Sequence, residues 1–319
     1  MDVTMSFYTQ SVWTWWIAVY LFLGGLGAAT LTITFLTDMY VTRHRALVLW
    51  GAFSGIVMLG LGSLMLFIHL LDHWAVLQVL NPLVLFRQPH AWIAWGTQFI
   101  LWMMVWGVLY ALPHMMESDS IMRIPVLGHI LRWGWVRAIA YRCGTHCKLC
   151  GWMASINGIG TAVYTGLLLQ SFPAVALWHN PGVPLLFTVS AFSTAFAYLL
   201  LVLNLAIKRE EDEHLRIVYE RIDLILISVE LVILFSFYQF MQAGSESAMR
   251  SAQILWHNMG WLVGFIGFGL IVPFFVELKG VVKGWRGPLP TVAASTLVLV
   301  GGYLLRHYML SAGVYVRPW

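Results

Sequence analysis

Residues 13–37 read WTWWIAVYLFLGGLGAATLTITFLT, a run without a single charged side chain. About 20 apolar residues in a helix are enough to cross the hydrocarbon core of a bilayer. The run is continuous and does not alternate between apolar and polar residues, which excludes a lipid-facing β-barrel strand. It is also longer than the apolar part of a signal peptide and ends without a cleavage site of small residues. We therefore predict a helix that is retained in the membrane.

The rest of the chain has the same character. Of its 319 residues, 60% are hydrophobic and only 10% are charged, and its mean hydropathy is +0.78. A soluble domain carries about 25% charged residues. Further runs of spanning length occur at 46–71, 91–113, 149–172, 184–207, 222–242, 254–276 and 289–310. The sequence thus predicts an all-α integral membrane protein with eight transmembrane helices.

The basic residues are distributed unevenly between the loops. Most of the 18 Lys and Arg residues follow the first, third, fifth and seventh runs, and the exceptions are Arg87, Arg250, Arg306 and Arg317. Because loops rich in Lys and Arg stay in the cytoplasm, we expect these four loops to be cytoplasmic and both termini to be periplasmic. The protein would then be a multi-pass protein of the bacterial inner membrane. The net charge of +4 comes mostly from loops, so it indicates orientation in a lipid bilayer and no nucleic-acid partner.

Two polar segments interrupt the apolar runs on the predicted cytoplasmic side. Within the loop at about 114–148, residues 121–142 mix Arg with Trp, Ile and Leu. This mixture is typical of an amphipathic helix that lies on the lipid headgroups. Residues 208–221, KREEDEHLRIVYER, are interpreted as a solvated charged turn that leads into the sixth run.

Ionisable and aromatic side chains gather where the predicted helices reach the outer leaflet. The stretch FIHLLDHW at 67–74 places an acid and two histidines on one helical face, at positions i, i+3 and i+4. Polar groups at membrane depth are costly and usually mark a site or a pathway, although Trp and Tyr also form belts at membrane interfaces. The gathered side chains are Trp13, Trp15, Trp16, Tyr20, His69, Asp72, His73, His90, Tyr164, Gln170, His257, Arg306 and His307.

These residue types suit the chemistry of a quinone. A quinol loses two electrons and two protons, and its oxygens need hydrogen-bond partners such as Tyr or His. A carboxylate or an imidazole then passes the protons to water. The ring and its isoprenoid tail fit an aromatic, apolar slot between helices.

Haem is one alternative to a quinone. A b-type haem between helices needs two axial ligands, usually histidines on facing helices. His69, His257 and His307 are candidates, but no pair of runs carries two histidines at a matching depth in the middle of the membrane.

A metal centre is a second alternative. The stretch CGTHCKLC at 143–150 holds Cys143, Cys147 and Cys150 around His146, a set that could bind zinc or part of an iron–sulfur cluster. The stretch falls in a predicted cytoplasmic loop, where thiols stay reduced. We expect free thiols and no metal.

Acidic residues inside the runs offer a route for protons. Glu230 lies in the middle of the sixth run, Asp223 is nearer the cytoplasmic side, and Asp38 ends the first run. They could relay protons between the faces, or bond across helices as structural groups. A proton channel or transporter subunit is therefore a third alternative, although the chain lacks the paired broken helices common in transporters.

Four stretches resemble the membrane-subunit family of polysulfide reductase, the NrfD/PsrC-like proteins. They are WWIAVYLFLGGLGAAT at 15–30, AVYTGLLLQSFPAVALWHNPGVPLLFTVSAFS at 162–193, RIDLILISVELVIL at 221–234 and GGYLLRHYMLSAG at 301–313. The most specific features are the Tyr-Thr-Gly at 164–166 and the Leu-Arg and Ala-Gly pairs of the last run.

The resemblance implies a fold of two four-helix bundles, at residues 1–172 and 173–319. It implies a menaquinone or ubiquinone site in the first bundle near the outer face, and no haem or iron–sulfur cluster in this subunit. Electrons would pass between that site and a ferredoxin-like iron–sulfur subunit docked outside. That subunit would serve a catalytic subunit of molybdenum or tungsten, hydrogenase or cytochrome type.

The resemblance also implies roles for single residues. Tyr164 matches the tyrosine that hydrogen-bonds the quinone, and His69 matches a histidine near the outer end of the second helix. Relatives often have Arg-Pro soon after that histidine, whereas this chain has Asp72-His73. We therefore predict that Asp72 accepts the protons.

The remaining site residues are predicted from their depth in the membrane. We expect His73 and His90 to assist Asp72, and Trp16 and Tyr20 to wall the ring pocket. The Cys run is not part of the family pattern.

Overall fold

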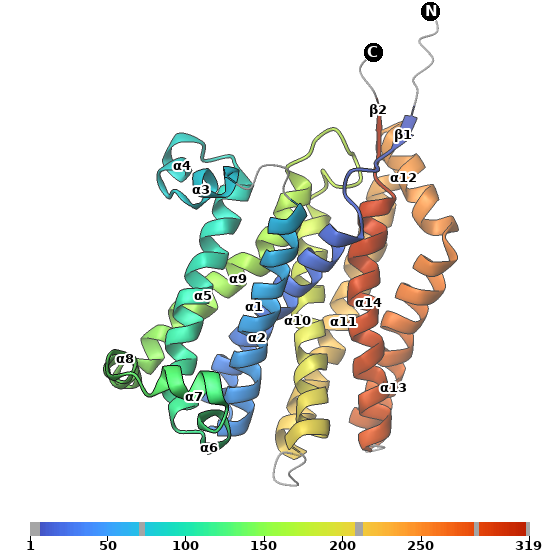
Figure 1. Ribbon diagram of the computed structural model, residues 1–319. Coiled ribbons are helices and arrows are strands. Elements are labelled where there is room, and N and C mark those ends of the chain that lie inside the picture. Colours follow the sequence, from blue (N-terminus) through green and yellow to red (C-terminus); the bar gives the residue numbers. More distant parts are fainter. Residues whose placement is uncertain (1–6, 70–73, 208–212, 284–286, 317–319) are drawn as a thin grey trace, which may run out of the picture.

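The computed structural model describes residues 7–69, 74–207, 213–283 and 287–316. Figure 1 shows long helices that run side by side, with short helices at both ends of the bundle. Strands β1 (Phe7–Thr9) and β2 (Val314–Val316) lie together at one end, which we call the termini side. The other end is called the opposite side.

Seven helices in the described part of the chain are long and apolar enough to cross a membrane, and each matches a predicted run. They are α1 (Trp15–Tyr40), α2 (Arg45–His69), α5 (Trp92–Met116), α10 (Gly182–Val202) with its π-helical extension η1 (Leu203–Ile207), α11 (Glu213–Gln242), the π-helical segment η3 (Gly260–Ile271) that continues into α13 (Val272–Lys283), and α14 (Pro288–Ser311). The prediction of a multi-pass helical membrane protein is confirmed.

The predicted run at 149–172 forms α9 (Cys147–Gln170), which is as long as the other spans. Its hydropathy is lower than that of the seven, because it carries Ser155, Asn157 and several threonines and glycines. It packs against α5 and α1 at the edge of the bundle, and Leu149, Ile156 and Ile159 on its outer face are exposed. That α9 is an eighth transmembrane helix stays a prediction, as does the periplasmic location of the termini.

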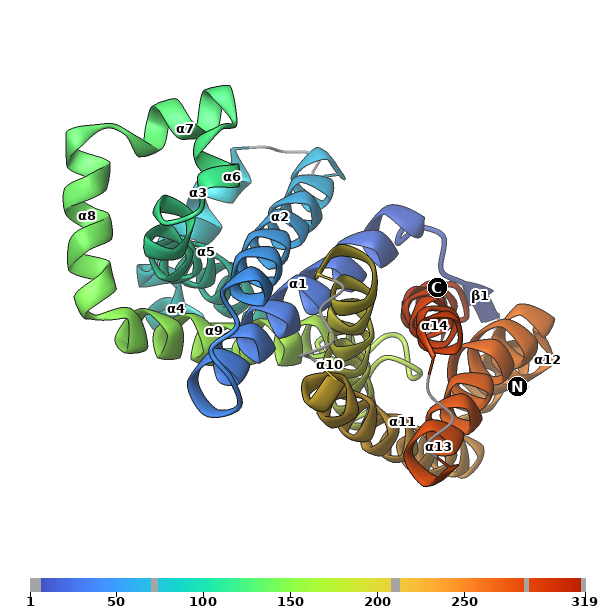
Figure 2. The same ribbon diagram turned by 90° about the horizontal axis from the view of Figure 1, so that it is seen from below.

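Helices α1 and α10 form the centre of the bundle and are the most buried of the seven spans. α1 packs against α2 and α9, whereas α10 packs against α11 and α14. α1 and α10 also contact each other, so the two sets of helices are joined at the centre of the bundle (Figure 2). Residue 172 falls between α9 and α10, and the division into two bundles at that point stays a prediction.

Three short helices cover the termini side. They are α3 (Ala75–Leu80), α4 (Leu83–Arg87) and α12 (Glu246–His257). We predicted a seventh run from residue 254, but α12 ends at His257 and the span begins at Gly260. The break falls at Asn258, because its side-chain Oδ1 accepts a hydrogen bond from the Gly260 N–H at 2.9 Å and so caps the new helix.

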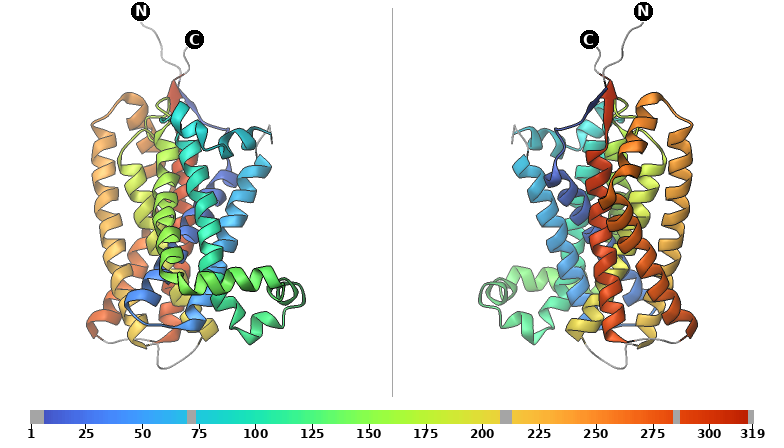
Figure 3. Two further views of the ribbon diagram at one scale, coloured as in Figure 1. Left: turned by 90° about the vertical axis from the view of Figure 1, so that its left-hand side faces the viewer. Right: turned by 90° about the vertical axis from the view of Figure 1, so that its right-hand side faces the viewer.

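Three short helices, α6 (Asp119–Met122), α7 (Pro125–Leu131) and α8 (Gly134–Thr145), project sideways from the bundle near the opposite side (Figure 3). The prediction of one amphipathic helix over 121–142 was therefore wrong, because these residues belong to three separate helices. Pro125 has no N–H to donate and begins α7 at the first helical position. A second break precedes Gly134, where Trp133 has an extended backbone.

A two-stranded antiparallel ribbon joins the beginning and the end of the chain. Phe7 of β1 faces Val316 of β2, and Thr9 faces Val314. The backbone N–H of Gln10 then donates to the Gly313 carbonyl at 2.9 Å. The all-α prediction missed this ribbon, because strands of three residues are too short to show a period of two in the sequence.

Helices α1 and α2 cross closely where Gly27 faces Gly55. A Cβ atom on Gly27 would stand 2.6 Å from the Gly55 carbonyl oxygen and 2.8 Å from the Leu59 backbone nitrogen. Small residues allow helices in a membrane to approach to backbone contact, where dispersion forces are strongest. This crossing fixes the position of α2 beside α1, and hence of the end of α2 on the termini side.

We predict that Gly27→Ala lowers the thermal unfolding midpoint of the protein purified in detergent. The added methyl group meets backbone atoms that cannot move aside, and overpacking of this kind costs about 1–3 kcal/mol. Gly60→Ala in α2 is the matched control, because a Cβ atom there meets only the Met104 side chain at 3.8 Å. Equal midpoints for the two variants would contradict the close crossing.

Candidate functional site

Two tyrosines from different helices meet inside the bundle towards the termini side. The Tyr20 hydroxyl of α1 donates a hydrogen bond to the Tyr164 hydroxyl of α9 at 3.3 Å. Each residue is only 1% exposed. Gly96 of α5 makes room for the Tyr164 ring, because any Cβ atom on Gly96 would overlap that ring. Three helices therefore hold this pair in place.

A cavity of about 390 Å³ lies against the two tyrosines, and we call it the tyrosine cavity. Its polar members are Tyr20, Tyr164, His90 and Ser171. Its other members are Trp13, Ile17, Leu66, Ala91, Trp92, Ile93, Leu168 and Phe172. A few polar groups within a largely apolar and aromatic wall are typical of small-molecule sites, whose volumes run from about 300 to 1,000 Å³.

A second cavity of about 470 Å³ adjoins the first, and we call it the apolar cavity. It lies between α1, α2 and α5, and its wall is formed mainly by Leu, Ile, Met and Phe side chains. Tyr20, Leu66 and Ile93 belong to the walls of both cavities. The two hollows are therefore neighbours. The tyrosine cavity contains the Tyr164 hydroxyl, whereas the Ser63 and Thr97 hydroxyls of the apolar cavity donate to carbonyls of their own helices.

Aromatic rings brace the wall of the tyrosine cavity. The Trp13 ring lies 4.9 Å from Phe172, edge to face, and 5.2 Å from Trp178. Trp178 is buried, and its Nε1–H donates to the Met309 carbonyl at 2.7 Å. Aromatic pairs of this geometry contribute about 0.5–1.5 kcal/mol beyond the area that they bury.

Gln10 holds the segment that carries Trp13. Its amide nitrogen donates to the carbonyls of Trp13 and Leu310 at 3.0 and 2.8 Å, and its Oε1 accepts from the Trp13 N–H at 2.9 Å. Because Gln10 directly follows the ribbon of β1 and β2, the ribbon helps to position the cavity wall. Neither Gln10 nor Trp13 was predicted as a site residue.

The predicted site residues fall into several places. Tyr20, Tyr164 and His90 share the tyrosine cavity. Trp16 lines neither cavity, and its ring stacks on Trp15 at 4.1 Å. His69 is the last residue of α2, one turn beyond Leu66 of both cavity walls.

Three predicted site residues belong to the stretch FIHLLDHW at 67–74. The side chain of His69, together with Asp72 and His73, lies outside the described residues. Their predicted roles therefore stay predictions.

Asp38 lies at the other end of α1, far from the tyrosines along the helix. Its Oδ2 accepts a hydrogen bond from the Tyr110 hydroxyl of α5 at 3.2 Å. The Tyr110 ring contacts His114, and His114 Nε2 is 3.7 Å from the Cys147 sulfur. Asp38 therefore joins a small polar cluster on the opposite side.

The three cysteines are free thiols, of which Cys143 and Cys150 are buried. Within the described ranges, no three His, Cys, Asp or Glu side chains gather in a way that could hold a metal ion. Cys147 instead lies beside His114. For the haem alternative, His257 is on α12, outside the seven spans, and this position removes it from mid-membrane depth.

Helix α11 carries three buried acids on one face, Glu220, Asp223 and Glu230, and each is at most 5% exposed. Asp223 Oδ1 accepts from the Ser193 hydroxyl of α10 at 2.6 Å. Glu220 Oε1 accepts from the Thr291 hydroxyl of α14 at 3.0 Å. Glu220 belongs to the segment that we predicted to be a solvated turn, but α11 already begins at Glu213 and buries it.

A fourth acid, Glu277 of α13, lies beside the Asp223 carboxyl and is 5% exposed. Apart from each other, Asp223 Oδ2 and both Glu277 oxygens have no hydrogen-bond partner among the described residues. Glu277 was not predicted as a buried acid, because the seventh run was expected to end at residue 276. The helix in fact continues to Lys283 and takes Glu277 into the bundle.

Arg306 of α14 is fully buried near the termini-side end of this row of acids. Its Nη1 donates to the Gly302 carbonyl at 2.6 Å and to the Ser190 hydroxyl at 3.2 Å, and its Nη2 donates to the Phe187 carbonyl at 3.2 Å. Ser190 also lies beside the Glu230 carboxyl. A serine of α10 thus connects the buried cation with the nearest buried acid.

The fold and these groups define a multi-pass helical membrane protein that carries ionisable side chains in its core. Its sequence matches the family described as polysulphide reductase, NrfD, over residues 4–317. The protein belongs to this family. Membership makes a membrane subunit of a respiratory redox-enzyme complex its coarse functional class.

Three relatives align with almost the whole sequence. Protein NrfD of Escherichia coli (strain K12) is 28% identical over 334 residues, which cover 98% of both proteins. The protein NrfD homolog of Haemophilus influenzae is 24% identical over 336 residues, again with 98% of both proteins covered. The C subunit of polysulfide reductase from Wolinella succinogenes is 25% identical over 324 residues, which cover 96% of this protein and 95% of the relative.

Proposed function

We propose that this protein is the quinone-reactive membrane subunit of a multi-subunit respiratory oxidoreductase. It exchanges electrons between menaquinone or ubiquinone and an iron–sulfur subunit that docks on the termini side. The observation that carries this proposal is the Tyr20–Tyr164 pair, because it places hydroxyl groups at the meeting point of a polar and an apolar cavity.

The two cavities match the two parts of a quinone. The flat headgroup has oxygens at its edge and fits the tyrosine cavity, which contains hydroxyl and imidazole groups within an aromatic wall. The isoprenoid tail needs only apolar contacts and fits the apolar cavity between α1, α2 and α5. The shared wall residues Tyr20, Leu66 and Ile93 would lie where the headgroup joins the tail.

The Tyr164 hydroxyl would donate a hydrogen bond to a quinone oxygen. Because Tyr20 donates to Tyr164, the Tyr164 O–H is directed elsewhere, and it has no acceptor among the described residues. A hydroxyl that accepts one hydrogen bond is a stronger donor in the next, since neighbouring bonds in a chain polarise each other. The pair is therefore suited to hold a carbonyl oxygen and to stabilise the charge that develops on it.

Proton exchange would occur at the mouth of the tyrosine cavity. His90 lines the cavity and is exposed, so its imidazole can contact both the substrate and water. His69, Asp72 and His73 follow Leu66 in the sequence, and Asp72 would accept the protons released by a quinol. Trp16 would act indirectly, through the stacked pair that it forms with Trp15 at the start of α1.

The partners follow from electron transfer and from sidedness. The electrons need an acceptor close to the quinone, and the tyrosine cavity lies towards the termini side. A ferredoxin-like subunit would dock there and connect to a catalytic subunit of molybdenum or tungsten, hydrogenase or cytochrome type. The excess of Lys and Arg in the loops on the opposite side supports a periplasmic termini side in a bacterial inner membrane.

The proposal includes proton transfer through the second set of helices. From the termini side, Arg306, Glu230, Asp223, Glu277 and Glu220 form a row across α14, α11 and α13. Neighbouring carboxyls in a dry environment share a proton instead of both carrying a charge, which suits a relay. Asp38 would be an exit group on the opposite side. This row also favours the second candidate function, a proton-conducting subunit.

We predict that Tyr164→Phe lowers the rate of quinone turnover by the complete complex at least tenfold. That factor corresponds to about 1.4 kcal/mol of lost stabilisation. The hydroxyl is removed while the ring remains against Gly96. Turnover of the catalytic partner with a soluble redox dye, which bypasses the membrane subunit, should not change.

Tyr198→Phe in α10 is the control for this variant. It removes the same atom from a tyrosine that lines neither cavity. Quinone rates that are equal in the wild type and in Tyr164→Phe would contradict the role of Tyr164. An equal loss in Tyr198→Phe would point to a general effect on folding.

A second prediction concerns the row of buried acids. Glu277→Gln keeps the shape of the side chain but removes its exchangeable acid proton. We expect it to abolish proton translocation coupled to quinone turnover in proteoliposomes, while turnover continues.

Glu246→Gln is the control for the row, because the Glu246 side chain on α12 is exposed and pairs with Arg250 at 2.8 Å. Full translocation in Glu277→Gln would exclude the row as the route. Proton flux through the subunit without redox partners would identify the protein as a channel.

A further inference from the structure

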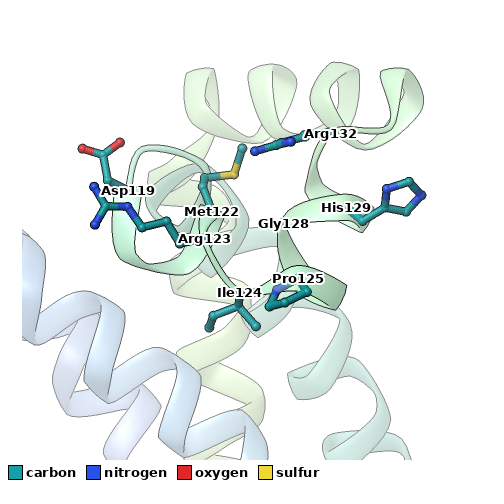
Figure 4. A pocket seen from close by; sticks show the side chains of 8 residues that line it. All are labelled: Asp119, Met122, Arg123, Ile124, Pro125, Gly128, His129 and Arg132. Atoms are coloured by element: carbon teal, nitrogen blue, oxygen red, sulfur yellow. The ribbon is translucent and has the colours of Figure 1, made fainter.

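A hollow of about 440 Å³ lies among the short helices of the opposite side, and we call it the arginine pocket (Figure 4). It is lined by Asp119, Met122, Arg123, Ile124, Pro125, Gly128, His129 and Arg132. No residue of this pocket belongs to the proposed quinone site, which lies towards the other side of the bundle. A ligand that binds in this pocket would therefore be a different molecule from the quinone.

The pocket exists because two short helices meet at a sharp angle. Pro125 starts α7 directly after the end of α6. Gly128 of α7 then packs on the Met122 carbonyl, and a Cβ atom on Gly128 would overlap that oxygen. The backbone is thereby folded back on itself, and the side chains of α6 and of the end of α7 stand around a common hollow.

The pocket carries an excess of positive charge. Figure 4 shows Arg132 pointing towards Met122, with Arg123 and Asp119 together on the other rim and the His129 ring turned away. Among the described residues, neither guanidinium has an ion-pair partner within 4.0 Å. The two guanidinium groups stand on opposite rims of the pocket and outnumber its one carboxylate, which favours an anion that also offers a hydroxyl to Asp119.

Another cation on the opposite side, Arg45, is already paired with an acid. Arg45, at the start of α2, pairs with Glu117 at 3.1 Å. This pair joins the beginning of α2 to the end of α5, just before α6. It thereby holds α2 close to the short helices.

An apolar groove of about 350 Å³ adjoins the arginine pocket. It lies between the first turns of α2 and the helices α6 and α7, and Ile124 belongs to both hollows. Trp50 and Phe53 of α2 line the groove and are 50% and 44% exposed. The groove therefore offers a bare apolar surface next to a cationic pocket, at the end of a membrane-spanning helix.

We propose that the arginine pocket and the apolar groove bind one anionic phospholipid with a hydroxylated headgroup. Arg123 and Arg132 hold the phosphate, as guanidinium groups do by charge-assisted hydrogen bonds. Asp119 accepts a hydrogen bond from a headgroup hydroxyl. One acyl tail lies in the groove against Trp50 and Phe53.

The charge of the surrounding surface supports an anionic lipid over a zwitterionic one. Arg137, Arg142 and Lys148 follow on α8 and α9, so the whole projecting segment is basic. A choline headgroup would bring its cation towards these residues, whereas a glycerol headgroup would not. The bound lipid would fix the projecting helices α6 to α8 against α2.

The site is tested with the purified full-length protein by native mass spectrometry during titration with phosphatidylglycerol. The variant Arg123→Ala/Arg132→Ala should bind the first lipid at least tenfold more weakly than the wild type. Arg137→Ala/Arg142→Ala is the matched control, because it removes the same charge from the surrounding surface on α8 and leaves the pocket intact. It should weaken binding much less than the change inside the pocket. All four side chains are exposed, so neither variant removes a buried contact.

The ligands separate the sources of the phosphate and the parts of the lipid. Phosphatidylcholine should bind at least tenfold more weakly than phosphatidylglycerol, and phosphatidic acid, which lacks the glycerol, should bind more weakly as well. Inorganic phosphate and glycerophosphate should not displace phosphatidylglycerol, because they cannot fill the groove. Equal losses in both double variants, equal binding of phosphatidylcholine, or displacement by inorganic phosphate would overturn the proposal.

Discussion

Hydrocarbon around the protein makes every unpaired polar group costly, and the structure depends on this constraint. Backbone N–H and C=O groups pair with each other within long helices, and for this reason the predicted spans of the protein are helical. Side chains that remain polar must find partners inside the bundle. Tyr20 and Tyr164 pair with each other, and Asp223 pairs with Ser193. The buried ionisable groups Glu220, Asp223, Glu230, Glu277 and Arg306 are therefore gathered in one part of the bundle, and they mark where chemistry is feasible.

Glycines allow the helices to approach closely and leave the space in which the proposed quinone site is formed. At Gly27 and Gly55 they bring α1 and α2 to backbone contact, and at Gly96 a glycine opens the space that the Tyr164 ring fills. The ribbon of β1 and β2, followed by Gln10, then fixes Trp13 over the cavity. The proposed quinone site thus depends on residues from both ends of the sequence. Its polar and apolar hollows meet at Tyr20, as the two parts of a quinone require.

The sequence was sufficient for the seven spans that the structure describes, because an apolar run of 20 or more residues is a strong and local signal. It also identified Tyr20, Tyr164 and His90 as neighbours, since depth in the membrane places side chains along one axis. It could not show which residues face each other around the bundle. For that reason Gly96 was missed, and Trp16 was expected at the cavity wall in place of Trp13, which was predicted only as a member of the outer cluster. Glu277 was missed because a charged residue at the end of a run looks like a helix end.

The central claim is that the tyrosine cavity holds the quinone headgroup. The most direct test is photolabelling of the membrane-embedded complex with an azido-quinone that is competent in turnover, followed by peptide mapping. We expect the azido-quinone to label residues of the cavity wall, such as Ile93 and Leu168, and excess native quinone to prevent this labelling. Competed label confined to α11, α13 and α14 would contradict it.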